Sequence, residues 1–192
     1  YMDLLDLFAG GWTHANCTTT GVTLKDVQCY DFASSYPACL TTRTFPIDKF
    51  VEVEPSEYDF LLSLDLEDVN LPYHYWLEFE AYDIDSKTCN TWWSNSKCVE
   101  IKSGQYDNGK IFAADYVRIK MTDLDFDTFR KAYEYDKDSF KIIRMYKAES
   151  GYLPVEFIQL ILKWYGNKTS FKGIEEKIAE YNRLSVLELF QK

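Results

Sequence analysis

The chain has 192 residues, of which 46% are hydrophobic and 17% are aromatic. This composition excludes the intrinsically disordered class, and a chain of this length buries about two thirds of its unfolded surface without disulfides or a structural metal. Lys and Arg number 21 against 31 Asp and Glu, so the net charge of −10 argues against tight, non-specific binding of nucleic acid over the whole surface.

Nothing in the sequence predicts a membrane span or an export signal. The first eleven residues, YMDLLDLFAGG, lack a basic region, and no apolar run approaches the roughly 20 residues of a membrane-spanning helix. The chain has five cysteines, an odd number, and none of them forms a C-x-x-C pair. This pattern predicts reduced and mostly buried thiols. We therefore expect a soluble, globular, cytoplasmic protein with no membrane partner.

The first fifty residues predict a strand followed by a helix. Val22, Leu24 and Val27 alternate imperfectly along GVTLKDVQCYDF, which predicts a strand that reaches Asp31. Pro37 in SSYPACL is compatible with a helix only in its first turn, so a corner between strand and helix is expected there.

From residue 50 to residue 145 most segments have the pattern of strands. The predicted strands are EYDFLLSLDLE, YHYWLEFEAYDI, KCVEIKSG, YVRIKMTD and FKIIRMYKA. The segment YDNGK, residues 106–110, contains the Asn-Gly pair of a tight hairpin turn. One helix is expected in TDLDFDTFRKAYEY, with Thr122 or Asp123 as its N-terminal cap.

The C-terminal part predicts two helices. Phe157, Leu160, Ile161 and Trp164 have helical spacing in LPVEFIQLILKWYGNKT, and GIEEKIAEYNRLSVLELFQ follows as a second helix after a lysine-bearing turn. The predicted fold class is therefore α+β, with mixed or antiparallel sheets, a few helices and a C-terminal helical hairpin. Soft boundaries near residues 50 and 150 divide the chain into the ranges 1–50, 51–150 and 151–192.

Asp31 is a candidate metal ligand. Mg²⁺ takes one or two protein carboxylates and fills its other positions with water and phosphate, and Asp31 is expected where a strand ends. The alternative is that Asp31 caps the following helix. Ser34 and Ser35 also fit caps or turns, Tyr36 fits a half-buried aromatic residue, and His14 without a neighbouring His or Cys fits a structural histidine.

Two motifs in order resemble those of family B DNA polymerases. Phe8-Ala9-Gly10-Gly11, followed by DFASSYP at residues 31–37, is similar to the Y-x-G-G and D-x-x-S-L-Y-P motifs of these enzymes, especially the protein-primed polymerases of bacteriophages and linear plasmids. The run GGWTHAN, residues 10–16, resembles a sequence common in the same family. The similarity extends through the middle of the chain to about residue 184.

The resemblance implies a role for each polar residue of the second motif. Asp31 would bind the catalytic Mg²⁺ ions, and Phe32 would add its main-chain carbonyl as a metal ligand. Ser34 and Ser35 would lie beside the triphosphate of the incoming dNTP. Tyr36 would place its ring beneath the sugar and exclude a 2′-hydroxyl.

The resemblance also implies contacts outside this motif. Phe8, Gly10 and Gly11 would contact the DNA primer-template, with Phe8 in place of the usual tyrosine. Lys168 and Lys172 are candidates for nucleotide binding, and the alternative is that both are solvated surface lysines.

The resemblance is incomplete at the C-terminal end. Where the family has K-x-x-x-N-S-x-x-G, this chain reads SVLELF, and the later Y-x-D-T-D-S motif with its second metal-binding aspartate is missing. We therefore expect a fragment that comprises the start of the palm (1–50), a strand-rich insertion contacting terminal protein and DNA (51–150) and part of the fingers (151–192).

The intact parent would be a DNA-directed DNA polymerase of viral or plasmid replication, acting in the cytoplasm of a bacterial host. This chain alone is expected to be inactive, because it lacks the second carboxylate. The alternative is a non-catalytic binding module, or a degenerate relative, that contacts terminal protein or DNA.

Overall fold

The computed structural model describes residues 21–32, 34–63, 71–88, 91–171 and 173–174, with residues 7, 19 and 177 as single positions. The chain divides into two compact units, each built from two stretches of sequence. The first unit comprises Tyr1–Gln28 and Asp48–Ser150, and the second comprises Cys29–Ile47 and Gly151–Lys192.

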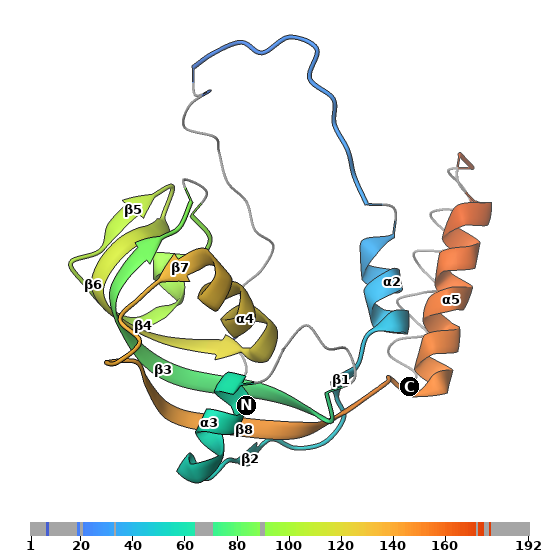
Figure 1. The fold of residues 1–192 in the computed structure, drawn as a ribbon. Coiled ribbons are helices and arrows are strands. Elements are labelled where there is room, and N and C mark those ends of the chain that lie inside the picture. Colours follow the sequence, from blue (N-terminus) through green and yellow to red (C-terminus); the bar gives the residue numbers. More distant parts are fainter. Residues whose placement is uncertain are drawn as a thin grey trace. The chain divides into compact units, whose positions relative to one another are not determined.

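The first unit contains a curved antiparallel sheet (Figure 1). Its long strands are β3 (Tyr73–Ser86), β6 (Lys110–Thr122) and β8 (Lys141–Gly151). β3 lies between β8 and β6, and β4 (Cys98–Lys102), which follows a 3-10 turn at Asn95–Lys97, pairs with the far side of β6. Short strands extend the sheet: β2 (Val51–Glu52) pairs with β8, β5 (Gln105–Asp107) with β6 and β7 (Tyr133–Glu134) with β3. All of these pairs are antiparallel, which confirms the predicted fold class.

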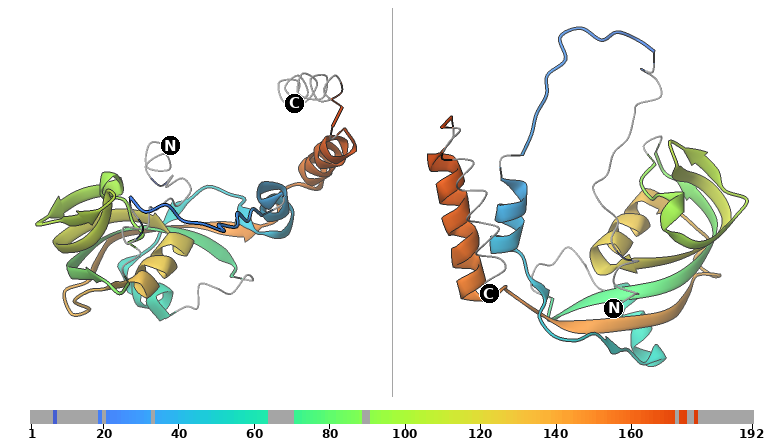
Figure 2. Two further views of the ribbon diagram at one scale, coloured as in Figure 1. Left: turned by 90° about the horizontal axis from the view of Figure 1, so that it is seen from above. Right: turned by 180° about the vertical axis from the view of Figure 1, so that it is seen from behind.

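Alternation along β3 places apolar side chains on one face of the sheet. Leu77, Phe79 and Ala81 are fully buried, and in the β6 register they lie opposite Met121, Ile119 and Val117. The helices α3 (Tyr58–Ser63) and α4 (Asp123–Ala132) cover this face (Figure 2). The hydrophobic core of the unit therefore lies between the sheet and these two helices.

Aromatic side chains fill the centre of this core. The Phe79 ring lies 5.3 Å from Phe126, 5.2 Å from Phe129 and 5.3 Å from Phe140, measured between ring centroids. Tyr133 closes one side, where its hydroxyl donates to the Ile111 carbonyl and accepts from the Trp93 amide at 3.0 Å. The buried hydroxyl thus has partners on both neighbouring segments, as a buried polar group requires.

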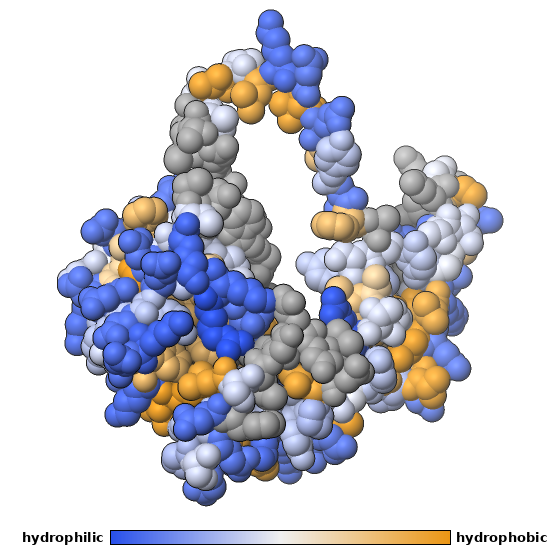
Figure 3. Space-filling view, in the orientation of Figure 1, coloured by the Kyte–Doolittle hydropathy of each residue, from blue (hydrophilic) through white to orange (hydrophobic). Residues whose placement is uncertain are grey.

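The helix α4 begins as the sequence predicts. Thr122 is the N-cap, and its hydroxyl accepts a hydrogen bond from the Asp125 amide, while Asp123 and Asp125 lie in the first turn. Figure 3 shows hydrophilic side chains gathered over this helix, on the side away from the core.

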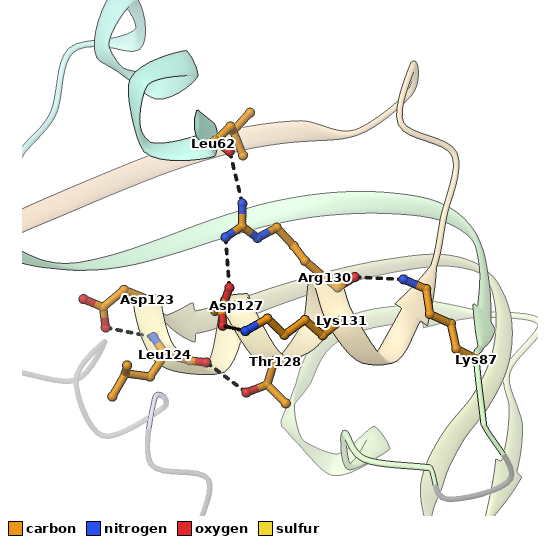
Figure 4. A network of polar contacts seen from close by, with 8 residues as sticks. All are labelled: Leu62, Lys87, Asp123, Leu124, Asp127, Thr128, Arg130 and Lys131. Carbon is orange, nitrogen blue, oxygen red and sulfur yellow. Dashed lines mark hydrogen bonds and ion pairs between the residues drawn. The ribbon is translucent and has the colours of Figure 1, made fainter. Parts of the chain in front are cut away.

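Ion pairs link side chains within α4, and hydrogen bonds join the helix to neighbouring segments (Figure 4). Asp127 pairs with Arg130 at 3.0 Å and with Lys131 at 2.7 Å. Burial opposes ionisation of Asp127, but these two cations outweigh it and hold the pKa of the carboxyl below its usual range. Arg130 also donates to the Leu62 carbonyl, and Lys87 donates to the Arg130 carbonyl, so α4 is linked to α3 and to the end of β3.

Asp123 continues the hydrogen bonding of the sheet where β6 turns into α4. Its carboxylate accepts from the Tyr75 amide at 3.0 Å and lies 3.2 Å from Nδ1 of His74. The last β6 residue paired with β3 is Thr122, opposite Trp76, so the Tyr75 amide has no further β6 residue opposite it. The Asp123 side chain takes the place of a backbone carbonyl at this position.

The prediction of a strand in EYDFLLSLDLE is wrong for its described part. Residues Pro55–Glu57 form a 3-10 turn that runs into α3. Pro55 at the first helical position and the acids Glu57 and Asp59 are signals of a helix N-terminus. Tyr58 and Leu62, four residues apart, both pack against the core, which is a helical and not a strand spacing.

The predicted hairpin at residues 106–110 is confirmed. Asp107 pairs with Lys110 across a two-residue turn, and both central residues have positive φ, 48° at Asn108 and 73° at Gly109. Asn-Gly is the pair of residues that adopts this mirror-image turn most readily.

The second face of the sheet carries an ion-pair cluster centred on Glu78. Its side chain is 2% exposed, and its two oxygens accept from Nε of Arg118 on β6 at 2.6 Å and from Nε of Arg144 on β8 at 2.7 Å. Beside it Trp76 and Tyr146 stack at 4.3 Å between ring centroids, and the Arg144 guanidinium lies 5.3 Å from the Trp76 ring. Charged and aromatic groups therefore replace the apolar packing found on the other face.

The second unit contains two helices that lie side by side, α2 (Ser35–Thr42) and α5 (Val155–Ser170), together with the short strand β1 (Phe45–Pro46) (Figures 1 and 2). Leu160 and Ile161 on α5 are buried. Both helices are where the sequence predicts them. The second helix of the predicted hairpin lies outside the described residues.

We expect Glu78→Gln to lower the free energy of unfolding by about 2 to 3 kcal/mol, because an amide cannot neutralise both arginines. The value is below the full cost of breaking a buried ion pair, since the arginine side chains are 36% and 30% exposed. Urea denaturation measures the change. Glu149→Gln, at an exposed position of β8, is the matched control, and equal effects of the two changes would contradict the role of Glu78.

Candidate functional site

Residues 21–32 do not form the strand that their alternation predicts. The segment has no strand pairing, and its large apolar side chains are exposed, from 55% at Leu24 to 87% at Phe32. Figure 3 shows these apolar side chains at the surface of the segment. A strand needs a neighbour to satisfy its amides and carbonyls, and no described strand pairs with this segment.

Asp31 and Phe32 lie in this exposed segment, just before α2. The N-cap of α2 is Ser34, and it has no side-chain capping hydrogen bond, so Asp31 is not the capping residue. Among the residues that the structure describes, no hydrogen bond or ion pair engages the Asp31 carboxylate. The carboxylate is therefore open to a ligand.

The chain turns sharply between Asp31 and the helix. Ser34 has the left-handed conformation, with φ 59° and ψ 38°, and α2 begins at Ser35. Pro37 is the third helical residue, within the first turn as expected, and the Ala38 amide donates to the Ser34 carbonyl at 3.0 Å. A left-handed serine costs about 1 to 2 kcal/mol, and such conformations concentrate at ligand sites.

The Tyr36 side chain is 86% exposed. The alternative interpretation of Tyr36 as a half-buried aromatic residue is therefore wrong. Asp31, Phe32, Ser34, Ser35 and Tyr36 thus present a carboxylate, hydroxyls and an open ring within six positions. The role that the motif resemblance gives to each of these residues stays a prediction.

Lys168 lies in the last turn of α5 and is exposed. The helix α5 packs beside α2 in the same unit. Candidate nucleotide-binding residues therefore lie on two neighbouring helices. Phe8, Gly10, Gly11, His14 and Lys172 lie outside the described residues.

The donors near Asp31 are oxygens, which is the chemistry that Mg²⁺ prefers. The set is small, however. Within the described ranges, no group of three or more His, Cys, Asp or Glu residues gathers in a way that could hold a metal ion. The carboxylate of Asp31 and the main-chain carbonyl of Phe32 are oxygen donors, and by themselves they would supply only part of the ligands of a magnesium ion.

Two of the cysteines differ from expectation. Cys29 and Cys39, on either side of Asp31, are exposed and not buried, and both are free thiols. Cys98 on β4 is half-buried, and burial raises the pKa of its thiol to about 12. Cys17 and Cys89 lie outside the described residues.

Among the described residues, no helix is both long enough and apolar enough to span a membrane.

The sequence analysis did not single out two buried acids that join distant segments of the first unit. Glu78 and Asp123 are buried acids that bond to strands distant in sequence, Glu78 to Arg118, 40 residues away, and Asp123 to the Tyr75 amide, 48 residues away. The available signal was the alternation in WLEFEAY, which places Glu78 on the face opposite Leu77 and Phe79.

No protein-family model matches the chain, and no curated protein matches it in sequence. In structure it superposes on the ternary complex of phi29 DNA polymerase with primer-template DNA and incoming nucleotide substrates, with a TM-score of 0.51 over 84% of this chain. The fold is similar to that of part of phi29 DNA polymerase.

The likeness concerns the fold alone, since the two chains are 17% identical. This chain spans 25% of the length of the polymerase chain. A second structure of phi29 DNA polymerase, the binary complex with primer-template DNA, matches 78% of this chain and 23% of its own, with 16% identity and a TM-score of 0.46.

We expect thiol labelling at pH 8 to separate the cysteines around Asp31 from Cys98. Cys29 and Cys39 are exposed, whereas the Cys98 thiol is half-buried and its pKa of about 12 keeps it protonated. Maleimide labelling followed by peptide mass spectrometry should show Cys29 and Cys39 modified first. Labelling in denaturant is the control, and equally fast modification of Cys98 in the folded protein would contradict its burial.

Proposed function

We propose that the chain is part of a protein-primed family B DNA polymerase, whose intact form transfers nucleotides to a primer under the direction of a DNA template. The observation that carries this proposal is the fold likeness to phi29 DNA polymerase over 84% of the chain. The order of the motifs FAGG and DFASSYP supports it independently.

In this proposal the residues before and within α2 form one side of the nucleotide site. Asp31 and the Phe32 carbonyl hold the magnesium ions, which orient the triphosphate and stabilise the charge that develops during transfer. Ser34 and Ser35 lie next to the phosphates. The exposed Tyr36 ring lies beneath the sugar, where it would clash with a 2′-hydroxyl.

Further contacts come from outside this motif. Lys168 on α5, and Lys172 after it, contact the nucleotide as point charges. Phe8, Gly10 and Gly11 contact the primer-template strand. The second metal-binding carboxylate belongs to another part of the intact protein, so the 192-residue chain is inactive by itself.

The strand-rich unit of residues 51–150 is assigned to the contacts with terminal protein and DNA. Its acids gather in VEVEPSEYDFLLSLDLEDV and MTDLDFDTF, which favours a basic protein partner over a polyanion. Terminal protein, which must present a priming hydroxyl to the active site, is the partner that fits the proposal.

We expect Asp31→Asn to reduce primer extension by the intact protein to the level of a control without protein, with Mg²⁺ or with Mn²⁺. The amide cannot replace the carboxylate as a metal ligand. Asp26→Asn is the matched control in the same exposed segment, because asparagine tolerates the positive φ of 56° found at that position. Full activity of Asp31→Asn, or nucleotide incorporation by the 192-residue chain alone, would contradict the proposal.

We expect the 192-residue chain to bind the terminal protein of the same genome faster at low salt than at high salt, and to bind duplex DNA weakly at both. The acidic surface steers a basic partner and repels phosphates. Titrations at two salt concentrations measure both affinities. Tight DNA binding with a steep salt dependence, without binding of the terminal protein, would show that the assignment of residues 51–150 is wrong.

A further inference from the structure

The second face of the sheet, opposite the face that α3 and α4 cover, presents positive charge at its centre (Figure 2). The Glu78 side chain is only 2% exposed, whereas those of its partners Arg118 and Arg144 are 36% and 30% exposed. Solvent therefore meets the two guanidinium groups and not the carboxylate between them. Two arginines against one glutamate also leave this cluster with an excess of positive charge, although the whole chain is acidic.

A lysine extends the positive charge to β4. Lys102 lies opposite Tyr116 in the register of β4 and β6, and its Nζ lies 4.6 Å from the centroid of the Tyr116 ring. The Lys102 side chain is 62% exposed, and its ion pair with Glu100, at 3.3 Å, is weakened by solvent. Tyr116 and Arg118 alternate along β6 and so lie on the same face. Cations from β4, β6 and β8 therefore share the second face.

Aromatic rings accompany these cations. Phe112 follows the same alternation along β6 as Tyr116 and Arg118, and it is 40% exposed. Tyr82, opposite Tyr116 on β3, is half-buried, and the centroids of these two rings lie 5.1 Å apart. Cations and aromatic rings on the surface of an antiparallel sheet are the groups with which proteins bind single-stranded nucleic acid, because cations contact the phosphates and bases stack on the rings.

The helical side of the same unit presents acids. Glu54, Glu57 and Asp59 lie in or next to the 3-10 turn and α3, and all three are exposed. A polyanion is therefore attracted to the second face and repelled from the helical side. The exposed ring of Phe112 favours a single strand over a duplex, whose bases are already stacked on one another, and over an acidic peptide.

We propose that the second face of the sheet binds single-stranded DNA, with phosphates at Lys102 and Arg118 and bases on the rings of Phe112 and Tyr82. This inference rests on the proposed function and deepens it. It gives the DNA contacts of residues 51–150 to one face of the sheet and leaves the acidic helical side to a basic protein partner. It also agrees with weak binding of duplex DNA.

The test is the affinity of the 192-residue chain for fluorescently labelled oligothymidylate, measured by anisotropy at two salt concentrations. Lys102→Gln removes one phosphate contact, so it should weaken binding several-fold at low salt and reduce the salt slope by about 0.7. Phe112→Ala removes a stacking ring and should weaken binding about tenfold. Both side chains are exposed, and unchanged urea denaturation of the two variants checks that the fold is retained.

The matched controls lie on α4, on the other side of the unit. Lys131→Gln changes a lysine that is 54% exposed and paired with Asp127, as Lys102 is paired with Glu100. Leu124→Ala removes an apolar side chain at a residue that is 62% exposed. Neither control should weaken binding of the oligonucleotide by more than about twofold.

Equal losses on the two sides of the unit, or no binding of the oligonucleotide at low salt, would overturn the proposal. Binding of polyglutamate that Lys102→Gln weakens, without binding of the oligonucleotide, would assign the face to an acidic protein and reject single-stranded DNA. The polymerase function is tested separately by primer extension with Asp31→Asn, so a failure of this inference is distinguishable from a failure of the proposed function.

Discussion

The carboxylate of Glu78 fixes the sheet on which the first unit is built. Each of its oxygens accepts from an arginine on a different neighbouring strand, Arg118 of β6 and Arg144 of β8. A shift of either strand by one residue would leave a buried charge without its partner, which is far more costly than the loss of an apolar contact. The central strand therefore has one permitted alignment with both neighbours.

That alignment determines what lies on the opposite face. With Glu78 turned away from the helices, Leu77 and Phe79 must point toward α4, where Phe126 and Phe129 close around the Phe79 ring. The hydroxyl of Tyr133, the C-cap residue of α4, then bonds to Ile111 of β6, and Arg130 of α4 donates to the Leu62 carbonyl of α3. Polar groups on one face and aromatic packing on the other thus specify the same arrangement.

The parts that the sequence predicted are those governed by local pattern. The strands around Phe79, the Asn108-Gly109 turn and the Thr122 cap follow from alternation, backbone preference and side-chain capping. The α3 helix was missed because its apolar run is too short to separate the two periodicities. The segment before Asp31 has the pattern of a strand without a partner, and no sequence pattern reveals whether a neighbour is present. For the candidate site, the sequence motif from Asp31 to Tyr36 identified the residues. The exposure of the Tyr36 ring and of the neighbouring thiols was not predictable, because it depends on tertiary packing.

The hydrogen bond between Asp123 and the Tyr75 amide also affects how the protein behaves at high concentration. The first residues of β3 extend beyond the end of β6, and an edge of this kind is a template on which another chain can add a strand. The Asp123 carboxylate accepts the hydrogen bond of the Tyr75 amide, which an added strand would otherwise use. It also places a negative charge at this edge of the sheet. The carboxylate of the first α4 residue therefore also protects this edge of the sheet against edge-to-edge aggregation.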